Sequence, residues 1–191
     1  MKVEIEGVNY HIEILNEDKE QALVFLHGFT GSSVTWHSLV SHFPDYKIIL
    51  LDLLGHGLTE SPENPERYEM ELQLRDLEML FERMGLQKFA LAGYSMGGRV
   101  ALAYACTYTE KLSALLLESA SPGLINEQQR SNRRKSDEEL AERIVSEGMV
   151  SFVDTWERFR CLKHRKHCRN RQKRQSGKNV WHRIRQVLRI V

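Results

Sequence analysis

A strand, a sharp turn and a helix are predicted over residues 89–105, and this motif constrains the fold more than any other part of the chain. The apolar run 89–92 precedes Gly-Tyr-Ser-Met-Gly at 93–97, and small residues in a helical pattern follow over 99–105. A serine at the apex of such a turn is held in a strained conformation, and flanking glycines let the helix and the strand approach closely. The pattern therefore predicts a nucleophile elbow with Ser95 at its apex, the alternative being an ordinary strand-to-helix turn.

A second apolar run, residues 22–26, leads directly into His-Gly-Phe-Thr-Gly-Ser at 27–32. In enzymes with a nucleophile elbow, the loop after such a strand supplies one backbone N–H of the oxyanion hole, and the residue after the nucleophile supplies the other. We therefore expect Phe29 and Met96 to form the oxyanion hole. His27 resembles a catalytic base by its position, but we expect it to be a structural histidine that braces the loop.

Strand-type runs and helical patterns alternate along most of the chain. Strands separated by helices imply a parallel sheet with helices on both faces, which makes the fold class α/β. The run 10–14 alternates between apolar and polar residues and is expected to be a half-buried edge strand. Ser33 is expected to cap one helix, Asn64 to cap a second one, and Gly85 to end that second helix. The remaining strand-type runs lie at 22–26, 47–51, 89–92 and 112–117.

Three motifs resemble those of the α/β-hydrolase superfamily: H-G-F-T-G-S at 27–32, D-x-x-G-H-G at 52–57 and G-Y-S-M-G-G at 93–98. Within this superfamily, the chain is similar to the 2-succinyl-6-hydroxy-2,4-cyclohexadiene-1-carboxylate synthases of menaquinone biosynthesis. The resemblance implies an α/β-hydrolase fold with a helical cap over the active site. It covers about residues 1–157, and its matching stretches are 26–32, 93–99 and 119–124.

The resemblance also implies a reaction. Such an enzyme is a lyase that eliminates pyruvate from a cyclohexene intermediate, and it requires neither a metal nor an organic cofactor. A set of Ser95, a histidine and an acid would remove a ring proton, so that the serine would serve in base catalysis and not in acylation. The N–H groups of Phe29 and Met96 would stabilise the developing oxyanion. Asp52 and His56 are expected to shape the loop that follows their strand.

Arginines are the expected binding groups for a small-molecule substrate with several carboxylates. Arg99 lies four residues after Ser95, so both share one helix face, and a guanidinium forms a planar fork suited to carboxylates. Tyr94 is expected to orient the substrate or to pack beside the serine. Arg130, Arg133 and Arg134 are further candidates, because the resembled family carries a substrate-binding arginine near this point.

Charge divides the chain at about residue 158. Residues 1–157 hold 14 Lys and Arg against 26 Asp and Glu, a net charge of −12, whereas residues 158–191 hold 13 Lys and Arg and no acid. We therefore expect three regions: a hydrolase core at 1–121, the start of a helical cap at 122–157, and a basic tail that is non-native coding or disordered at 158–191. The alternative for the middle region is a set of solvated surface helices.

The sequence supplies no clear catalytic partners for Ser95. In α/β-hydrolases the acid and the histidine follow the serine, each in a loop after a late strand. No residue after 117 stands in such a context, so we expect a reading-frame-shifted chain that is truncated before the last strands, inactive, and left with an open edge at 112–117. The remaining candidates are Asp137, Asp154, His164, His167 and His182.

Three other functions are weighed against the synthase. A carboxylesterase of the same fold would use Ser95 as an acylated nucleophile. The basic tail, with Phe159 and Trp181, could hold nucleic-acid phosphates, but we expect no nucleic-acid partner. Zinc binding by the run Cys161, His164, His167 and Cys168 is not expected, because its spacing fits no standard finger.

Composition bounds the location of the protein. The chain has no apolar window of about 18 residues, so no membrane span is expected, and its N-terminus lacks the apolar core of a signal peptide. Three cysteines are an odd number, which argues against a disulfide framework. These observations favour a cytoplasmic protein.

Overall fold

The computed structural model describes residues 1–148, 151–153 and 155–156. Residues 1–124 form one compact unit, and the described residues from 125 onward belong to a second unit. The strands of the first unit are β1 (Lys2–Ile5), β2 (Val8–Leu15), β3 (Ala22–Leu26), β4 (Lys47–Leu51), β5 (Phe89–Tyr94) and β6 (Leu112–Glu118). Its helices are η1 (Ser33–His42), η2 (Pro65–Tyr68), α1 (Met70–Arg83), α2 (Met96–Thr107) and η3 (Thr109–Lys111), and α3 (Glu127–Glu147) lies in the second unit.

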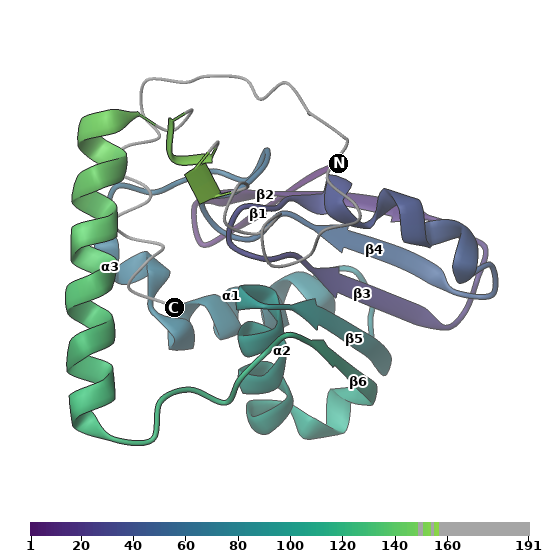
Figure 1. Ribbon diagram of the computed structural model, residues 1–191. Coiled ribbons are helices and arrows are strands. Elements are labelled where there is room, and N and C mark those ends of the chain that lie inside the picture. The colour runs from purple at the N-terminus through teal and green to yellow at the C-terminus, as the bar shows by residue number, and fades with distance from the viewer. Residues whose placement is uncertain (149–150, 154, 157–191) are drawn as a thin grey trace. The chain divides into compact units, whose positions relative to one another are not determined.

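The strands form one sheet in the order β1-β2-β4-β3-β5-β6 (Figure 1). Strands β4, β3, β5 and β6 run parallel, as expected for an α/β fold, whereas β1 and β2 are antiparallel additions. The prediction that residues 10–14 form an edge strand is wrong, because β1 pairs with β2 and takes the edge. A tight turn with positive φ at Glu6 (47°) and Gly7 (75°) makes this hairpin possible.

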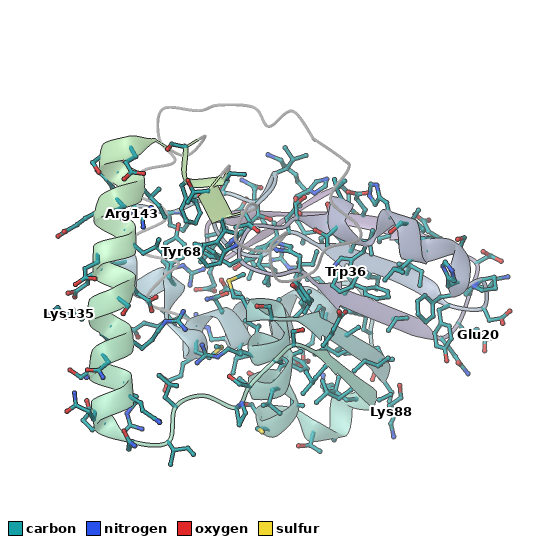
Figure 2. All side chains as sticks on the ribbon, viewed as in Figure 1. Glu20, Trp36, Tyr68, Lys88, Lys135 and Arg143 are labelled. Atoms are coloured by element: carbon teal, nitrogen blue, oxygen red, sulfur yellow. The ribbon has the colours of Figure 1, made fainter. Side chains whose placement is uncertain are left out.

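Helices cover both faces of the sheet, as predicted (Figure 2). On one face, Phe25 packs against Trp36 of η1 with ring centroids 4.9 Å apart. On the other face, Phe89 lies 4.8 Å from Phe81 of α1 and 6.1 Å from Tyr104 of α2, again between ring centroids. The residues of β5 alternate between these two cores, which is the geometry that strand periodicity requires.

Two predicted helix starts need correction. The first helix is the 3-10 helix η1, and its N-cap is Ser32 and not Ser33. Ser32 has the extended backbone of a cap residue (φ −158°, ψ −178°), whereas Ser33 is the first residue of the helix, where its hydroxyl donates to Glu13 and its N–H donates to Asp52. The second helix is two elements, since Glu69 is extended (ψ 141°) between η2 and α1.

The prediction that Gly85 ends the helix is confirmed, whereas Asn64 caps only the short helix η2 and not the helix that Gly85 ends, whose N-cap is Glu69. Asn64 caps η2 by accepting a hydrogen bond from the Glu66 N–H (3.0 Å). Gly85, with φ 70°, ends α1, because a left-handed residue cannot continue a right-handed helix.

The second unit is described chiefly by α3. Asn126 caps this helix by accepting from the Gln129 N–H (2.9 Å), and Gly148 with φ 95° follows its last residue. Most α3 side chains are exposed, and only Ala141 and Ile144 are buried within the helix. Among the described residues, none of the helices combines the length and apolar character that crossing a bilayer requires.

Candidate active site

Ser95 occupies the strained apex between β5 and α2. Its φ of 53° and ψ of −111° lie outside the regions that residues with a side chain ordinarily adopt. The Ser95 N–H donates to the carbonyl oxygen of Glu118 at the end of β6 (2.9 Å), and the Ser95 carbonyl accepts from the Arg99 N–H in the first turn of α2 (3.1 Å). The apex is therefore fastened on one side to the sheet and on the other to the helix.

Two glycines permit the close contacts around this turn. A Cβ atom built on Gly97 would lie 2.3 Å from the carbonyl oxygen of Leu26, and one built on Gly93 would lie 2.5 Å from the carbonyl oxygen of Gly97. Both contacts are with backbone atoms, which cannot rotate away as a side chain can. The glycine spacing that predicted the elbow thus has a direct steric cause.

The His-Gly loop after β3 packs against the apex. A Cβ atom built on Gly28 would lie 2.8 Å from Cδ1 of Tyr94 and 3.5 Å from Cβ of Ser95. Strands β3 and β5 are parallel neighbours, with Leu26 opposite Gly93, so their carboxyl ends bring the two loops together. The sequence prediction that these loops belong to one site agrees with this geometry.

The orientation of the Phe29 N–H follows from the hydrogen bonds of its own peptide unit. The Gly28 carbonyl oxygen accepts from the Gly31 N–H (2.8 Å) and from Nδ1 of His27 (2.8 Å). In a trans peptide the C=O and the next N–H point in opposite directions, so these two donors also fix where the Phe29 N–H points. The described residues contain no cis peptide bond.

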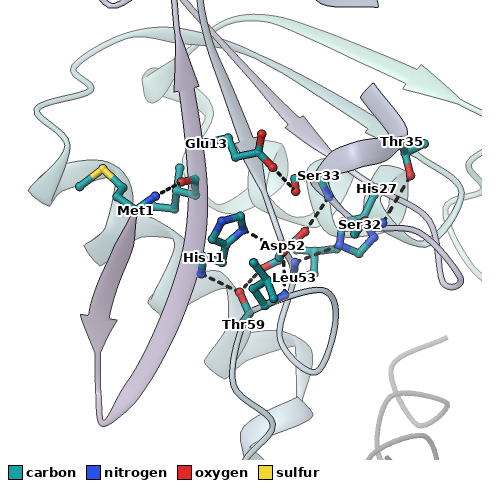
Figure 3. Close-up of polar contacts among 12 residues, drawn as sticks. Met1, His11, Glu13, His27, Ser32, Ser33, Thr35, Asp52, Leu53 and Thr59 are labelled. Carbon is teal, nitrogen blue, oxygen red and sulfur yellow. Dashed lines mark hydrogen bonds and ion pairs between the residues drawn. The ribbon is translucent and has the colours of Figure 1, made fainter. Parts of the chain in front are cut away.

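His27 is buried and neutral, and it links two loops (Figure 3). Its Nδ1–H donates to Gly28, and its Nε2 accepts from the Leu53 N–H (3.0 Å). Burial, followed by the nearby His56, lowers the pKa of His27 from 6.5 to about 3. With both nitrogens occupied, His27 braces the loop, as the sequence analysis expected, and does not offer a base to Ser95.

Asp52 shapes the following loop from a fully buried position (Figure 3). Its carboxylate accepts from the Ser33 N–H (2.6 Å), from the Leu58 N–H (2.9 Å) and from Nδ1 of His11 (2.9 Å). A buried carboxylate is stable only when such donors replace water. The contact with His11 was missed, because it comes from the pairing of distant strands and has no local sequence signal.

His56 connects the same loop to the candidate oxyanion residue. Its Nδ1 lies 3.0 Å from the Leu54 carbonyl oxygen, and its Nε2 lies 2.8 Å from the Phe29 carbonyl oxygen. Both partners are carbonyl oxygens, so a neutral imidazole donates to only one of them at a time. The Leu54 contact orients the ring within the 52–57 loop, and the Phe29 contact links that loop to the His-Gly loop. The expectation that Asp52 and His56 shape this loop agrees with these bonds.

The candidate substrate-binding residues fall into the two units. In the first unit, Tyr94 and Arg99 are half-buried beside Ser95, and a guanidinium nitrogen of Arg99 lies 3.9 Å from where a Cβ of Gly123 would be. The stretch 119–124 therefore comes close to the α2 side of the elbow. The sequence of this stretch resembles that of a known family, but no contact was predicted for it.

The three other arginines lie on α3 in the second unit, and each is already paired. Arg130 and Arg134 both bind the carboxylate of Glu127, at 3.0 and 2.5 Å, and Arg133 binds both oxygens of Asp137, at 2.8 and 2.7 Å. Arg130 and Arg133 stand three and four residues from their acids, and Arg134 stands seven residues, or about two turns, from Glu127, so each pair shares a helix face. A carboxylate ligand would have to compete with these acids.

A histidine for Ser95 is absent from the described part of the chain, where no imidazole nitrogen lies within hydrogen-bonding distance of the Ser95 hydroxyl. Asp137, a candidate acid, is held by Arg133. Within residues 1–148, 151–153 and 155–156 there is also no cluster of three or more side chains that could hold a metal ion. The candidates Asp154, His164, His167 and His182, and the zinc candidates Cys161 and Cys168, lie outside the described residues.

Comparison with known proteins supports a family assignment. Several curated relatives carry the name 2-succinyl-6-hydroxy-2,4-cyclohexadiene-1-carboxylate synthase. The Bacillus subtilis (strain 168) protein, to which the name is given provisionally, is 43% identical over 152 residues, or 80% of this chain and 56% of that protein. The Enterobacter sp. (strain 638) protein is 37% identical over 134 residues, or 70% of this chain and 51% of that protein. The chain thus spans about half the length of the curated relatives it matches.

Solved structures extend this likeness. MenH from S. aureus superposes with a TM-score of 0.75 at 31% identity, over 94% of this chain and 69% of that chain. A thermophilic esterase from Thermogutta terrifontis superposes with a TM-score of 0.64 at 28% identity, over 78% of this chain and 54% of that chain. Residues 21–160 match the family model described as the alpha/beta hydrolase fold. With a serine elbow at the end of β5 and a His-Gly loop beside it, the chain belongs to the α/β-hydrolase fold family.

Proposed function

We propose that this chain carries the elbow-bearing part of a 2-succinyl-6-hydroxy-2,4-cyclohexadiene-1-carboxylate synthase, a pyruvate-eliminating lyase of menaquinone biosynthesis. The observation that carries the proposal is the pairing of Ser95 at a strained apex with Arg99 one turn later on the same helix, close to the 119–124 stretch. A hydrolase of neutral esters has no use for a guanidinium at this point, whereas a polycarboxylate substrate does. The names of the relatives support the same choice.

In the proposed reaction, proton removal leads to bond cleavage. A base takes a ring proton, a ring double bond forms, and the C–O bond to the leaving group breaks, which releases pyruvate as its enolate for protonation. Ser95 would relay the proton to a histidine, and the N–H groups of Phe29 and Met96 would face the developing oxyanion. Arg99 and Tyr94 would hold the substrate, together with whichever of Arg130, Arg133 and Arg134 exchanges its acidic partner for a substrate carboxylate.

We expect no turnover by this chain alone. A serine hydroxyl is a weak base or nucleophile until an imidazole accepts its proton, and loss of the histidine costs about a millionfold in turnover in the subtilisin case. The described residues bring no imidazole to Ser95. We propose that the chain binds the reaction's carboxylates in the cytoplasm, without a cofactor, but does not turn them over.

Binding and turnover are therefore tested separately. Titration calorimetry with the reaction product is expected to detect binding that Arg99→Gln weakens by about tenfold or more, because a charge-assisted hydrogen bond is lost. Arg75→Gln is the matched control, since Arg75 is an exposed arginine paired with Glu6. Unchanged affinity in Arg99→Gln, or no binding by the wild type, would contradict the proposal.

A pyruvate-release assay beside the Bacillus subtilis relative tests turnover, and we expect no release from this chain. Pyruvate release that Ser95→Ala abolishes would contradict the predicted inactivity. The likeness to the Thermogutta terrifontis esterase makes a carboxylesterase the second candidate. Mass spectrometry after incubation with a p-nitrophenyl ester separates the two, since an acyl group on Ser95 would favour the esterase.

A further inference from the structure

His27 and His56 are neighbouring imidazoles with different sets of hydrogen-bond partners. Their ring centroids lie 5.0 Å apart. His27 meets one backbone carbonyl oxygen and one backbone N–H, a pairing that suits a neutral ring with its proton on Nδ1. His56 instead meets two carbonyl oxygens, that of Leu54 at 3.0 Å from Nδ1 and that of Phe29 at 2.8 Å from Nε2. The two rings therefore suit different protonation states.

Only a protonated ring can serve both carbonyl oxygens at His56. A neutral imidazole has one N–H and one bare nitrogen, whereas an imidazolium has two N–H donors. In a neutral His56 the lone pair of one nitrogen would face the lone pairs of a carbonyl oxygen at 2.8 or 3.0 Å. Hydrogen bonds to the charged form of a group favour that form. The pair of carbonyl oxygens therefore favours the imidazolium.

The ionisable groups around His56 also suit a cation. The buried carboxylate of Asp52 lies against the next residue of the loop, since a Cβ atom built on Gly57 would lie 2.0 Å from Asp52 Oδ2. His11 of β2 contacts the same carboxylate. Burial, followed by repulsion from His56, lowers the pKa of His27 to about 3, so His27 stays neutral beside it.

Histidines hold both peptide units that flank the Cα atom of Phe29. On one side, Nδ1 of His27 donates to the Gly28 carbonyl oxygen (2.8 Å), whose peptide unit includes the Phe29 N–H. On the other side, Nε2 of His56 lies 2.8 Å from the Phe29 carbonyl oxygen. A residue has only two soft backbone dihedrals, so holding both peptide units fixes the direction of the Phe29 N–H.

We propose that His56 is a positioning residue that stays protonated at neutral pH and uses its second N–H to hold Phe29 in place. The idea that the Phe29 N–H faces an oxyanion rests on the proposed function, whereas the charge of His56 does not.

Loss of one proton would leave His56 with a single donor for two acceptors. The Leu54 carbonyl oxygen is two residues away in the same loop, whereas Phe29 is 27 residues away in another loop. A local hydrogen bond orders less of the chain than a distant one does, so the Phe29 bond is the one expected to be lost. Raising the pH is therefore expected to loosen Phe29.

The first test is the protonation state of both rings in the full chain at about pH 7, where an ordinary imidazole is mostly neutral. Long-range proton–nitrogen NMR correlations distinguish a protonated ring nitrogen from a bare one. His56 is expected to show two protonated nitrogens, whereas His27, the matched control in the same spectrum, is expected to show a protonated Nδ1 and a bare Nε2. A bare nitrogen on His56 would overturn the proposal.

The second test follows the carbonyl carbon of Phe29 by carbon-detected NMR while the pH is raised until His56 loses its second proton. The Phe29 resonance is expected to move with the same midpoint as the His56 ring, because the hydrogen bond between them is lost at that step. This movement should vanish in His56→Gln, which keeps an N–H donor but does not titrate. It should persist in the control His37→Gln, because the exposed ring of His37 contacts Glu13.

A Phe29 resonance that stays fixed through the His56 titration, or that moves equally in His56→Gln, would overturn the proposal. Neither test uses a ligand, so failure here is distinct from failure of carboxylate binding and of the proposed function.

Discussion

Strands β3 and β6 are the two neighbours of β5. Both are rich in apolar residues, but they differ in how deeply their side chains are buried. Both run parallel to β5. Strand β3 is buried along its whole length, because β4 and β5 flank it and helices lie on both faces, whereas β6 has one flanking strand and is exposed. An apolar strand is therefore buried by its neighbours on all sides and not by its own composition.

The largest expected effect comes from disturbing the contact between the elbow and β3. Gly97→Ala is expected to lower the free energy of unfolding by about 3 kcal/mol or more, because the new Cβ would lie 2.3 Å from the Leu26 carbonyl oxygen. Urea denaturation followed by circular dichroism measures the effect. Gly85→Ala is the control, since Gly85 has open space and only its positive φ to resist a side chain, at a cost of about 1 kcal/mol. Equal losses in the two variants would contradict the close approach.

Truncating one leucine in each strand compares the two neighbours directly. Leu23→Ala in β3 is expected to cost about 3 kcal/mol, because Leu23 lies in the packed cluster with Phe25 and Trp36. Leu116→Ala in β6 is expected to cost less than about 1 kcal/mol in dilute solution, since nearly half of that side chain is exposed. The same denaturation experiment measures both. A loss of unfolding free energy in Leu116→Ala as large as that in Leu23→Ala would contradict the exposure of Leu116.

The burial of His27, which directly follows β3, also predicts that the free energy of unfolding depends on pH. The pKa of His27 is about 3 in the folded state, whereas the pKa of an exposed imidazole is 6.5. The unfolded chain therefore takes up a proton first, so the contribution of His27 to stability is complete above pH 6.5. It falls by about 1.4 kcal/mol for each pH unit below that, until the folded state is protonated too.

At about pH 5 this loss amounts to about 2 kcal/mol relative to about pH 7. Denaturation of the wild type and of His27→Gln at both pH values isolates it, because the carboxylates contribute equally to both proteins. An identical pH dependence in the two proteins would show that His27 is not held neutral.

The smallest expected effect concerns the strained apex residue at the end of β5. Ser95→Gly is expected to raise the free energy of unfolding by about 1 kcal/mol, because glycine adopts the strained apex conformation without a Cβ clash. Ser95→Ala keeps the Cβ atom and should bring no such gain. Thermal unfolding of the two variants measures the difference. A destabilised Ser95→Gly would indicate that the apex stores no strain.

Much of the site could be predicted because its causes are local. The glycines of 93–97 indicate that two backbones approach closely, because a Cβ atom would clash there. Gly85 indicates a helix end, because glycine adopts a positive φ at low cost. The ion pairs of Arg130 and Arg133 were not predicted, although Glu127 and Asp137 stand three and four residues from them, because these arginines were considered only as substrate-binding groups. The roles assigned to Phe29, Met96 and Arg99 in catalysis stay predictions.

The parts that sequence did not reveal have causes that lie far along the chain. Nothing in residues 10–14 shows that β1 will pair beside them, and nothing near His11 shows that Asp52 will accept its hydrogen bond. The exposure of β6 could not be predicted for the same reason. An apolar run indicates which environment suits a strand, but it does not indicate which strands will lie beside it.

The hydrogen bond from the Ser95 N–H to the Glu118 carbonyl oxygen joins the strained apex to the last residue of β6. Edge strands open more often than interior ones, so fraying of β6 would release this amide and let the apex relax. The hydrogen-exchange rate of the Ser95 amide therefore reports the local stability of β6. A strand that pairs with β6 would restrain the conformation of the serine without contacting it.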